Sequence, residues 1–483
     1  LSCDGMYTAG FYVMKKHTND FEHDAIPQLV LRLAIPTMLA QLVSVLYSIV
    51  DRMYIGHIPG SGASALTGVG VAFPLIMIIS AFAALVSMGG APRASIMMGK
   101  GDNEQANKIL GNCFTALVIT ALALTAVTMI FCEPLLMMFG ASENTIVYAK
   151  AYMMIYAAGT IFVQLTLGMN AFISAQGFSR VSMLTVIIGA ITNIVLDPIL
   201  IFGMFGLPAM GVTGAAVATV TGQMTACGLA VFCFLRTRTG IRITRKDMKI
   251  DAGIAKRIYA VGVPSGLMTA MPSLLVSILN ALLVGLHTLA VAAFGLYFKL
   301  QTFVYMPGNG LIQGMRPIVS YNYGAGQGRR LHLVIRWSLA LTAIIMALGT
   351  LIAWGVPRQI LGLFDADEAM IAVGVPMLRI TSLGFLVSTL GTVMAGCFEA
   401  LGKGLYSLSI SLLRQLLVIP PLAMVFSLSW GLNGVWAAFP VAEALAALVA
   451  VLLYRKVMRQ TDRQLQNSEV DCAGGKYPGS RNP

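Results

Sequence analysis

Apolar runs of about twenty residues recur along the whole chain, and each is long enough to cross the roughly 30 Å hydrocarbon core of a bilayer as a helix. The composition agrees, since 57% of the 483 residues are hydrophobic and 11% are charged, whereas about 25% of a typical soluble domain is charged. The alternating strands of a membrane barrel are not seen, so helices must satisfy the backbone polar groups. The sequence therefore predicts an all-α integral membrane protein.

We predict about twelve transmembrane helices, counted as apolar runs long enough to span a bilayer. Their boundaries follow from hydropathy and the positions of charged and turn residues. The predicted spans are 31–56, 66–90, 111–131, 149–173, 181–203, 210–235, 258–286, 289–315, 333–355, 370–397, 405–427 and 431–454.

Charge alternates between the two sets of loops. Every even-numbered span is followed by basic residues, such as Arg93 and Lys100 after the second and Arg316 after the eighth, whereas the other loops contain acids such as Glu133 and Glu143. Because cytoplasmic loops carry the excess of Lys and Arg, both termini are predicted to be cytoplasmic. The net charge of +12 therefore fits the basic cytoplasmic loops of a multi-pass protein of the cell membrane, and we expect no nucleic-acid partner.

The two halves of the chain resemble each other. GGAPRASIMMGKGDNEQANK (89–108) resembles GMRPIVSYNYGAGQGRRLHL (314–333), and FISAQGFSRVSM (172–183) resembles CFEALGKGLYSL (397–408). Six predicted spans separate equivalent points, so both copies have the same orientation. The expected architecture is two parallel six-helix bundles related by a pseudo-two-fold axis along the membrane normal.

The repeat divides the chain into five predicted parts, and a cavity between two such bundles is the expected substrate route of a secondary transporter. No Walker A sequence is present, so we expect an ion gradient to drive transport, without a cofactor. The predicted parts are a cytoplasmic N-terminal segment (1–28), an N-lobe (29–236), a basic cytoplasmic linker (237–257), a C-lobe (258–456) and a polar cytoplasmic tail (457–483).

Two carboxylates lie at membrane depth in the predicted N-lobe, where ionisable residues usually mark an ion or substrate path. Asp51 and Asp197 are at similar distances along spans that run in the same direction. Asn193 lies one turn before Asp197 on the same helix face, and Pro198 has no amide hydrogen for the carbonyl of Ile194. Oxygen groups of this kind bind hard cations or protons.

A structural role for Asp197 is the alternative, because an aspartate beside a proline can form a turn at a helix end. The equivalent segment of the second half is LLVIPP (416–421), which keeps proline but has neither Asn nor Asp. The C-lobe instead contains Glu443 and Arg414, either as a structural ion pair, with Arg379 as another possible partner of Glu443, or as a second protonation site.

The chain resembles the multidrug and toxic compound extrusion (MATE) family. The resemblance rests on the doubled six-helix plan, the opening LAIPTMLAQLVSVLYSIVDRMYIGHI, the loop MGKGDNEQANK, the AQGFSR and ALGKG turns, and NIVLDP followed by GAAVATV, and it covers residues from about 25 to 455. It implies antiport, in which cationic or amphipathic compounds leave as Na⁺ or H⁺ enters. Both ions suit clustered carboxylates.

The resemblance also implies residue roles. In prokaryotic members with this arrangement, the cation or proton site of the N-lobe corresponds to Asp51, Asn193, Asp197 and Thr219, with a helix-1 bend at Pro36. Residues matching the substrate cavity are Tyr47, Tyr152 and Asn170, and we include Asn280 of the seventh span in the same prediction.

A flippase for a lipid-linked oligosaccharide is the alternative function, because related families share the twelve-helix plan. Its cavity should present several cations, for which Lys299, Arg379 and Arg414 are candidates. The seven cysteines and five histidines show no metal-ligand spacing, and no nucleophile–base constellation predicts an enzyme. We expect a monomer with no bound metal other than Na⁺ as coupling ion.

Overall fold

The computed structural model describes residues 19–236, 240–244, 246–286, 289–362, 364 and 367–473. Within these ranges the chain is helical and contains no strand. The first eighteen residues and the last ten lie outside the described part, as do residues 237–239 and 245 of the predicted basic linker.

The chain forms two compact units. Among the described residues, unit 1 comprises 19–20, 35–98 and 102–266, and unit 2 comprises 21–34, 99–101 and 267–473. Two long helices have parts in both units, namely α2 (Ile26–Gly56) and α10 (Ala252–Val284). The lobe limits proposed from the sequence remain predictions.

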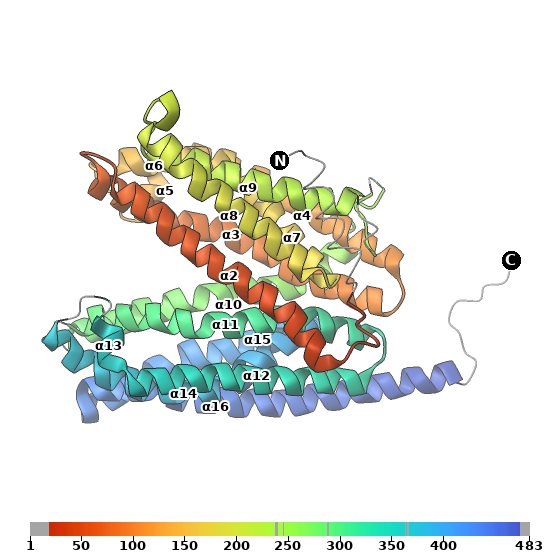
Figure 1. Ribbon diagram of the computed structural model, residues 1–483. Coiled ribbons are helices and arrows are strands. Elements are labelled where there is room, and N and C mark those ends of the chain that lie inside the picture. The colour runs from red at the N-terminus through yellow and green to blue at the C-terminus, as the bar shows by residue number, and fades with distance from the viewer. Residues whose placement is uncertain are drawn as a thin grey trace. The chain divides into compact units, whose positions relative to one another are not determined.

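Unit 1 is built from most of α2, the first half of α10 and the helices between them, labelled in Figure 1. Helices α8 and α9 pack along each other, and α7 packs on α4 and α9. The intervening elements are α3 (Gly62–Gly99), α4 (Asn103–Ile130), α5 (Cys132–Met138), α6 (Ile146–Ala158), α7 (Thr160–Ala175), α8 (Ser179–Phe202), η1 (Met204–Gly206) and α9 (Val212–Arg236).

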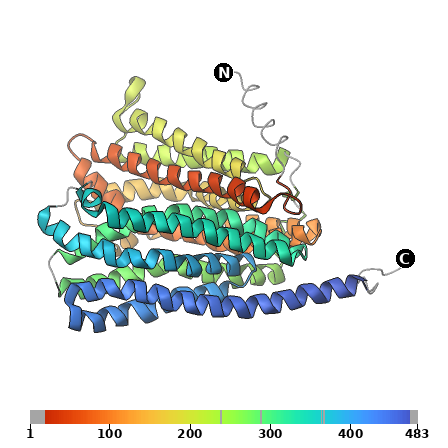
Figure 2. The ribbon, with the colours of Figure 1, turned by 60° about the horizontal axis from the view of Figure 1, so that its bottom comes forward.

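Unit 2 contains the remaining helices, and its helices α14 and α16 run side by side in both views of the ribbon (Figures 1 and 2). Helix α12 packs on α14 and α11. The elements after α10 are α11 (Ala290–Gly324), α12 (Gly328–Gly355), α13 (Pro357–Gly362), α14 (Glu368–Ala400), α15 (Gly404–Leu412), η2 (Leu413–Val418) and α16 (Ile419–Ala473).

Nine helical segments in the described ranges are long and apolar enough to cross a membrane, or ten when a bent pair is counted as one span. With the bent pair counted as one span, two further features account for the difference between ten and the predicted twelve. The segment Gly404–Arg463 holds two spans, because Gly431 has φ 56° and ψ −134° and the backbone of Gly434 then lies against the carbonyl of Phe426. Helix α11 is also long enough to span, at 35 residues, but it is more polar.

The fourth predicted span differs from the prediction of one unbroken helix. It is divided into α6 and α7, which are bent by 57° at Gly159. A Cβ at Gly159 would lie 2.5 Å from a methyl group of Val220, so the absence of a side chain lets the bend contact α9 closely.

Several helices extend beyond the apolar runs. Helix α3 continues to Gly99 and α11 to Gly324, so Arg93 and Arg316 lie in helices and not in the predicted loops. Helix α16 likewise continues to Ala473 through the region predicted as a polar tail. Hydropathy locates the membrane core, but these helices do not end where it ends.

Close backbone contacts hold α3 and α10 together in unit 1. A Cβ on Gly89 would lie 2.2 Å from the carbonyl oxygen of Ile258, and one on Gly262 would lie 2.0 Å from that of Leu85. The two contacts are reciprocal, each glycine facing a residue one turn before the other glycine. Small residues at such crossings are a common way to pack helices in a membrane, where the hydrophobic effect between helices is lost.

Candidate functional site

Helix α8 presents the two polar residues of the NIVLDP motif. It runs without interruption from Ser179 to Phe202, so Asp197 lies inside the helix and not in a terminal turn. Asn193 and Asp197 are one turn apart and are 2% and 0% exposed, respectively. Asp197 therefore does not form the turn at a helix end that was the alternative prediction.

Two glycines bring α8 close to α9. A Cβ on Gly189 would lie 3.0 Å from the carbonyl oxygen of Gly222, and one on Gly222 would lie 2.7 Å from that of Gly189 and 3.2 Å from Cβ of Asn193. One turn earlier on α9, Thr219 faces the Asn193 side chain. The crossing therefore brings residues 26 positions apart in the sequence into hydrogen-bonding contact.

A hydrogen-bonded chain joins three helices at this point. Nδ2 of Asn193 donates to Oδ1 of Asp197 at 3.3 Å and to Oγ1 of Thr219, also at 3.3 Å. The hydroxyl of Tyr152 on α6 donates to the same Thr219 oxygen at 3.5 Å. Since the amide donates in both directions, its carbonyl oxygen is turned away from these partners.

Helix α2 brings the second carboxylate to the cluster. The carboxyl groups of Asp51 and Asp197 lie close enough to interact directly, in agreement with the similar depths predicted for the two residues. Tyr47, one turn before Asp51, lies within electrostatic range of both carboxylates. Two carboxylates at this separation repel each other when both are charged. The pair is therefore stabilised when it binds a proton or another cation.

Three oxygens of this cluster have no hydrogen-bond donor in the described part of the protein. They are Oδ1 of Asp51, Oδ1 of Asn193 and Oδ2 of Asp197, and all three atoms are buried. A buried acceptor without a donor is strongly unfavourable. Two carboxylates and an amide carbonyl are also the oxygen ligands that hard cations prefer. The donor set fits a proton or Na⁺.

Arg52 does not neutralise this cluster by an ion pair. Its side chain is exposed, and its guanidinium group stacks over the ring of Phe73 at 4.9 Å from the centroid. The interaction is a cation–π contact on the surface of unit 1. Successive residues of a helix point about 100° apart, which allows Arg52 to face away from the neighbouring Asp51.

Tyr156 is a member of the cluster that the sequence reasoning missed. Its ring stacks on that of Tyr152, with centroids 6.2 Å apart and an angle of 16° between the planes. It is 5% exposed and lies within electrostatic range of Tyr47. The spacing of four residues from Tyr152 would have placed it on the same helix face.

The other predicted cavity residues are not joined to the cluster by a hydrogen bond. Asn170 on α7 accepts a 2.8 Å hydrogen bond from Thr185 on α8. Asn280 lies on the part of α10 that belongs to unit 2, and its Oδ1 is buried without a donor in the described ranges. Their roles in substrate binding remain predictions.

Pro36 is buried inside the continuous helix α2. The contacts of α2 pass from unit 2 to unit 1 between Ala34 and Ile35, directly before this proline. A proline removes one backbone hydrogen bond from a helix and favours a kink. The predicted role of Pro36 as a bending point remains a prediction.

The second polar site predicted in the C-lobe is an ion pair in unit 2. Nη1 of Arg414 lies 3.0 Å from Oε1 of Glu443. Of the two arginines proposed as partners, Arg414 makes this bond, whereas Arg379 is exposed and its carbonyl oxygen accepts a bond from Trp354.

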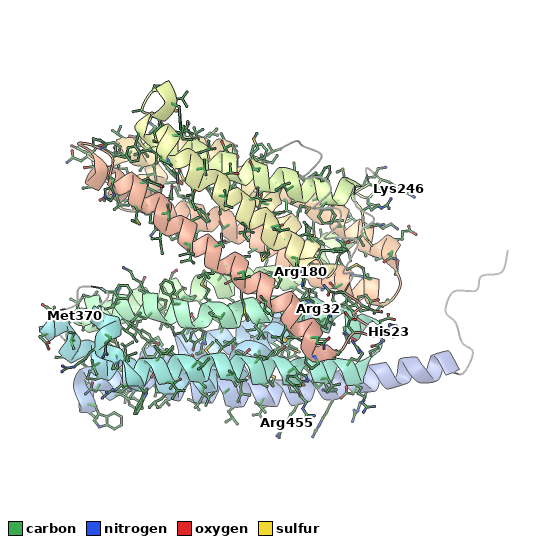
Figure 3. The ribbon with its side chains drawn as sticks, viewed as in Figure 1. His23, Arg32, Arg180, Lys246, Met370 and Arg455 are labelled. Atoms are coloured by element: carbon green, nitrogen blue, oxygen red, sulfur yellow. The ribbon has the colours of Figure 1, made fainter. Side chains whose placement is uncertain are left out.

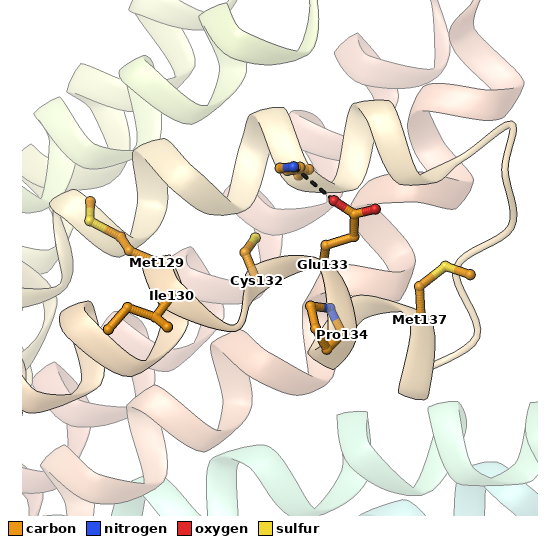
Figure 4. A pocket seen from close by; sticks show the side chains of 7 residues that line it. Met129, Ile130, Cys132, Glu133, Pro134 and Met137 are labelled. Carbon is orange, nitrogen blue, oxygen red and sulfur yellow. Dashed lines mark hydrogen bonds and ion pairs between the residues drawn. The ribbon is translucent and has the colours of Figure 1, made fainter.

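An open pocket of about 510 Å³ lies elsewhere on unit 1 and is lined by Met129, Ile130, Cys132, Glu133, Pro134, Met137 and Lys150 (Figure 4). Lys150 forms a 2.8 Å ion pair with Glu133 there. Both side chains are about half exposed, at 49% and 58%. The hydrogen bond from Lys150 holds the pKa of Glu133 below its ordinary value. None of the residues of the buried carboxylate cluster lines this pocket.

Comparison with known proteins identifies the family. The MatE profile matches residues 36–199 and 264–424, which together make up more than half of the chain. This chain belongs to the MatE family. The two matched stretches agree with the repeat that was found in the sequence.

MatE relatives match along most of the chain. Multidrug export protein MepA of Staphylococcus aureus (strain NCTC 8325 / PS 47) is 25% identical over 439 residues, covering 90% of this chain and 94% of that protein. MepA of Staphylococcus saprophyticus is also 25% identical, over 433 residues, covering 90% of this chain and 94% of that protein.

Solved structures show the same fold. A crystal structure of MATE in the bent conformation has a TM-score of 0.85 at 24% identity and covers 92% of this chain and 98% of that one. An outward-facing multidrug resistance MATE family transporter of the MOP superfamily has a TM-score of 0.84 at 23% identity, covering 92% and 99%. The MatE chain is therefore an all-α membrane protein with the twelve-helix, two-lobe fold of these structures.

Proposed function

We propose that the protein is a secondary active multidrug exporter, which moves cationic or amphipathic compounds out of the cell in exchange for Na⁺ or H⁺. The observation that carries this proposal is the group of three buried oxygens without donors, on Asp51, Asn193 and Asp197. Membership of the MatE family and the similarity to MepA multidrug export proteins support the transport of drugs.

The cluster can couple the two movements by competition. With no cation bound, two adjacent carboxylates favour a positively charged drug; with Na⁺ or H⁺ bound, that attraction is lost. A ligand can shift a conformational equilibrium only by its difference in affinity for the two states. Cation and drug must therefore favour opposite states, which expose the site alternately to the two sides of the membrane.

Aromatic residues give the cluster a surface for organic cations. Tyr47 lies beside the two carboxylates. Tyr152 is hydrogen-bonded to Thr219, and its ring stacks on that of Tyr156. Aromatic faces attract organic cations without a fixed hydrogen-bonding geometry. This chemistry favours a broad range of cationic compounds.

The alternative flippase function has less support. It needs several cations to hold a pyrophosphate group. Of the three candidates from the sequence, Lys299 and Arg379 are exposed, and Arg414 is paired with Glu443. The carboxylates in unit 1 would also repel an anionic headgroup.

We propose that the protein lies in the bacterial cell membrane with both termini cytoplasmic. Figure 3 shows His23 and Met370 at opposite ends of unit 2. Near His23, Arg330 donates to the carbonyl oxygens of Phe21 and Asp24, whereas Met370 follows the acidic residue Asp367 that caps α14. The excess of basic residues favours the His23 end as the cytoplasmic one.

Ethidium binding to the purified protein tests the proposed competition. Binding is followed by fluorescence polarisation during separate titrations with Na⁺ and H⁺. We expect one of these ions to displace ethidium from the wild type, and we expect Asp197→Asn to lose that sensitivity. Glu133→Gln is the matched control, since it removes a carboxylate from the exposed pocket in unit 1 and should behave like the wild type. Unchanged ion sensitivity in Asp197→Asn would exclude the cluster as the coupling site.

A further inference from the structure

In unit 2, the predicted twelfth span also contains a carboxylate, Glu443 on α16, and its environment differs from that of the carboxylates in unit 1. Nη1 of Arg414 donates to Oε1 of Glu443 at 3.0 Å and to Oε2 at 3.4 Å. The side chains are 23% and 9% exposed, respectively. The ion pair is therefore largely removed from solvent.

A local change of helix geometry positions Arg414. The segment Leu413–Val418 is a π-helix, in which the N–H of Ile419 donates to the carbonyl of Arg414, five residues earlier. Pro420 and Pro421 follow directly and cannot donate to carbonyls one turn before them. A π-turn contains an additional residue and changes the direction of its side chains, and such turns are frequent at functional sites.

The ion pair is located in the second repeat near the position of the carboxylate cluster in the first. LLVIPP (416–421) corresponds to NIVLDP (193–198), and SWGLNGVWAAFPVAE (429–443) to GLPAMGVTGAAVATV (206–220). In this alignment Glu443 follows the counterpart of Thr219 by one residue. The contact between the fifth and sixth helices of each repeat is thus polar in both, but with different chemistry.

Neighbouring helices enclose Glu443. A Cβ on Gly384 of α14 would lie 3.2 Å from Cγ of Glu443, so α14 packs directly on this side chain. From α11, the hydroxyl groups of Tyr297 and Tyr305 are within electrostatic range of both Glu443 and Arg414. The Tyr305 hydroxyl donates to Ser388 at 2.8 Å. Arg414 is the cation that neutralises the carboxylate.

The two repeats differ in how their acceptor oxygens are satisfied. Both carboxylate oxygens of Glu443 accept a bond from Arg414, whereas Asp51, Asn193 and Asp197 each have a buried oxygen without a donor. The first repeat therefore needs an added cation, and the second contains its own.

We infer that Arg414 acts as a tethered cation that occupies Glu443 permanently and so restricts the exchangeable cation to the cluster in unit 1. The inference rests on the proposed function. A buried carboxylate without a partner is strongly unfavourable, so loss of the Arg414 charge would oblige Glu443 to take up a proton or Na⁺. Arg414 is on this account a specificity-determining residue, because it sets how many cations the transporter binds.

Cation binding to full-length protein in detergent tests the inference. Proton uptake is measured in weak buffer, and Na⁺ binding is measured by equilibrium dialysis. We expect Arg414→Gln to bind one more cation per molecule than the wild type, and Arg414→Gln/Glu443→Gln to return to the wild-type number. Arg414→Lys keeps the positive charge and should also bind the wild-type number.

Glu443→Gln supplies a second test that does not depend on the folding of Arg414→Gln. We expect it to keep the wild-type number of bound cations, because Glu443 carries no exchangeable ion. Loss of a bound cation in Glu443→Gln, or no gain in folded Arg414→Gln, would overturn the inference. The proposed function fails separately, if Asp197→Asn keeps all of the cation binding of the wild type.

Discussion

Replacing Thr219 by valine removes a hydroxyl group from the centre of the cluster while preserving a β-branched side chain. The Thr219 oxygen accepts hydrogen bonds from Asn193 at 3.3 Å and from Tyr152 at 3.5 Å. Without it, the Asn193 amide keeps only its bond to Asp197 and loses the contact that fixes its orientation. The amide carbonyl oxygen then becomes a poorer ligand for the cation.

The size of the effect follows from these two bonds. Side-chain hydrogen bonds between transmembrane helices average about 0.6 kcal/mol, so their loss amounts to about 1.2 kcal/mol. A free-energy change of about 1.4 kcal/mol corresponds to a tenfold change in affinity. We therefore expect Thr219→Val to weaken cation binding by up to roughly eightfold. Tyr152→Phe removes only one of the bonds and should weaken it by less than threefold.

The assay is the thermal unfolding of purified protein over a range of Na⁺ concentrations and pH values. A cation that binds only the folded state stabilises it by RT ln(1 + [cation]/Kd), so the rise of Tm with cation concentration gives the affinity. Thr221→Val is the matched control, since the Thr221 hydroxyl donates to the carbonyl oxygen of Val217 in its own helix and not to the cluster residues. An unchanged affinity in Thr219→Val would refute the proposed role of this hydroxyl in orienting Asn193, and a loss of a hundredfold would refute the estimate.

Two further predictions concern packing and pH. Gly89→Ala should lower the free energy of unfolding by about 1–3 kcal/mol in a denaturation assay, because its Cβ would lie 2.2 Å from the Ile258 carbonyl oxygen. Gly70→Ala in the same helix is the control. A Cβ at Gly70 would meet nothing within 4 Å, so this variant should lose no stability in the same assay. Glu133→Gln should lower the Tm slightly at neutral pH. Since the bond from Lys150 lowers the pKa of Glu133, its contribution is fully present above the unfolded-state pKa and is lost as the pH falls through the folded-state pKa. A Tm difference from wild type that persists below that pH, or that is insensitive to salt, would contradict this account.

The fold was predictable from the sequence because the bilayer imposes a length and a polarity on each span. The doubled plan followed from Pro92 and Pro317 at equivalent positions, and the MatE profile matches both halves. The bend at Gly159 was not predictable, since hydropathy does not distinguish a straight span from two helices that pack against Val220. The break at Gly431 lies close to the boundary between two predicted spans, but hydropathy does not predict its backbone conformation of φ 56° and ψ −134°.

The meeting of Asp51 with Asp197 was predictable from helix geometry, because both lie at similar depths and Asn193 shares a face with Asp197. The sequence could not show which atom of Asn193 faces Thr219, since that depends on the close approach of Gly189 and Gly222. The helical periodicity of the sequence also does not predict which side-chain oxygens of the cluster accept a hydrogen bond and which do not. The pairing of Arg414 with Glu443 was one of two possibilities, and the π-helical turn that favours it has no sequence signal other than the two prolines.

The most direct test of the account is ethidium efflux from proteoliposomes that contain the wild type or Asp197→Asn, with Na⁺ and pH gradients imposed separately. We predict that one of the two gradients drives efflux by the wild type. The Asp197→Asn variant, shown to be folded by its thermal unfolding, should give no efflux under either gradient. Gradient-driven efflux by Asp197→Asn at the wild-type rate would contradict the central claim that the buried carboxylate cluster couples drug export to cation entry.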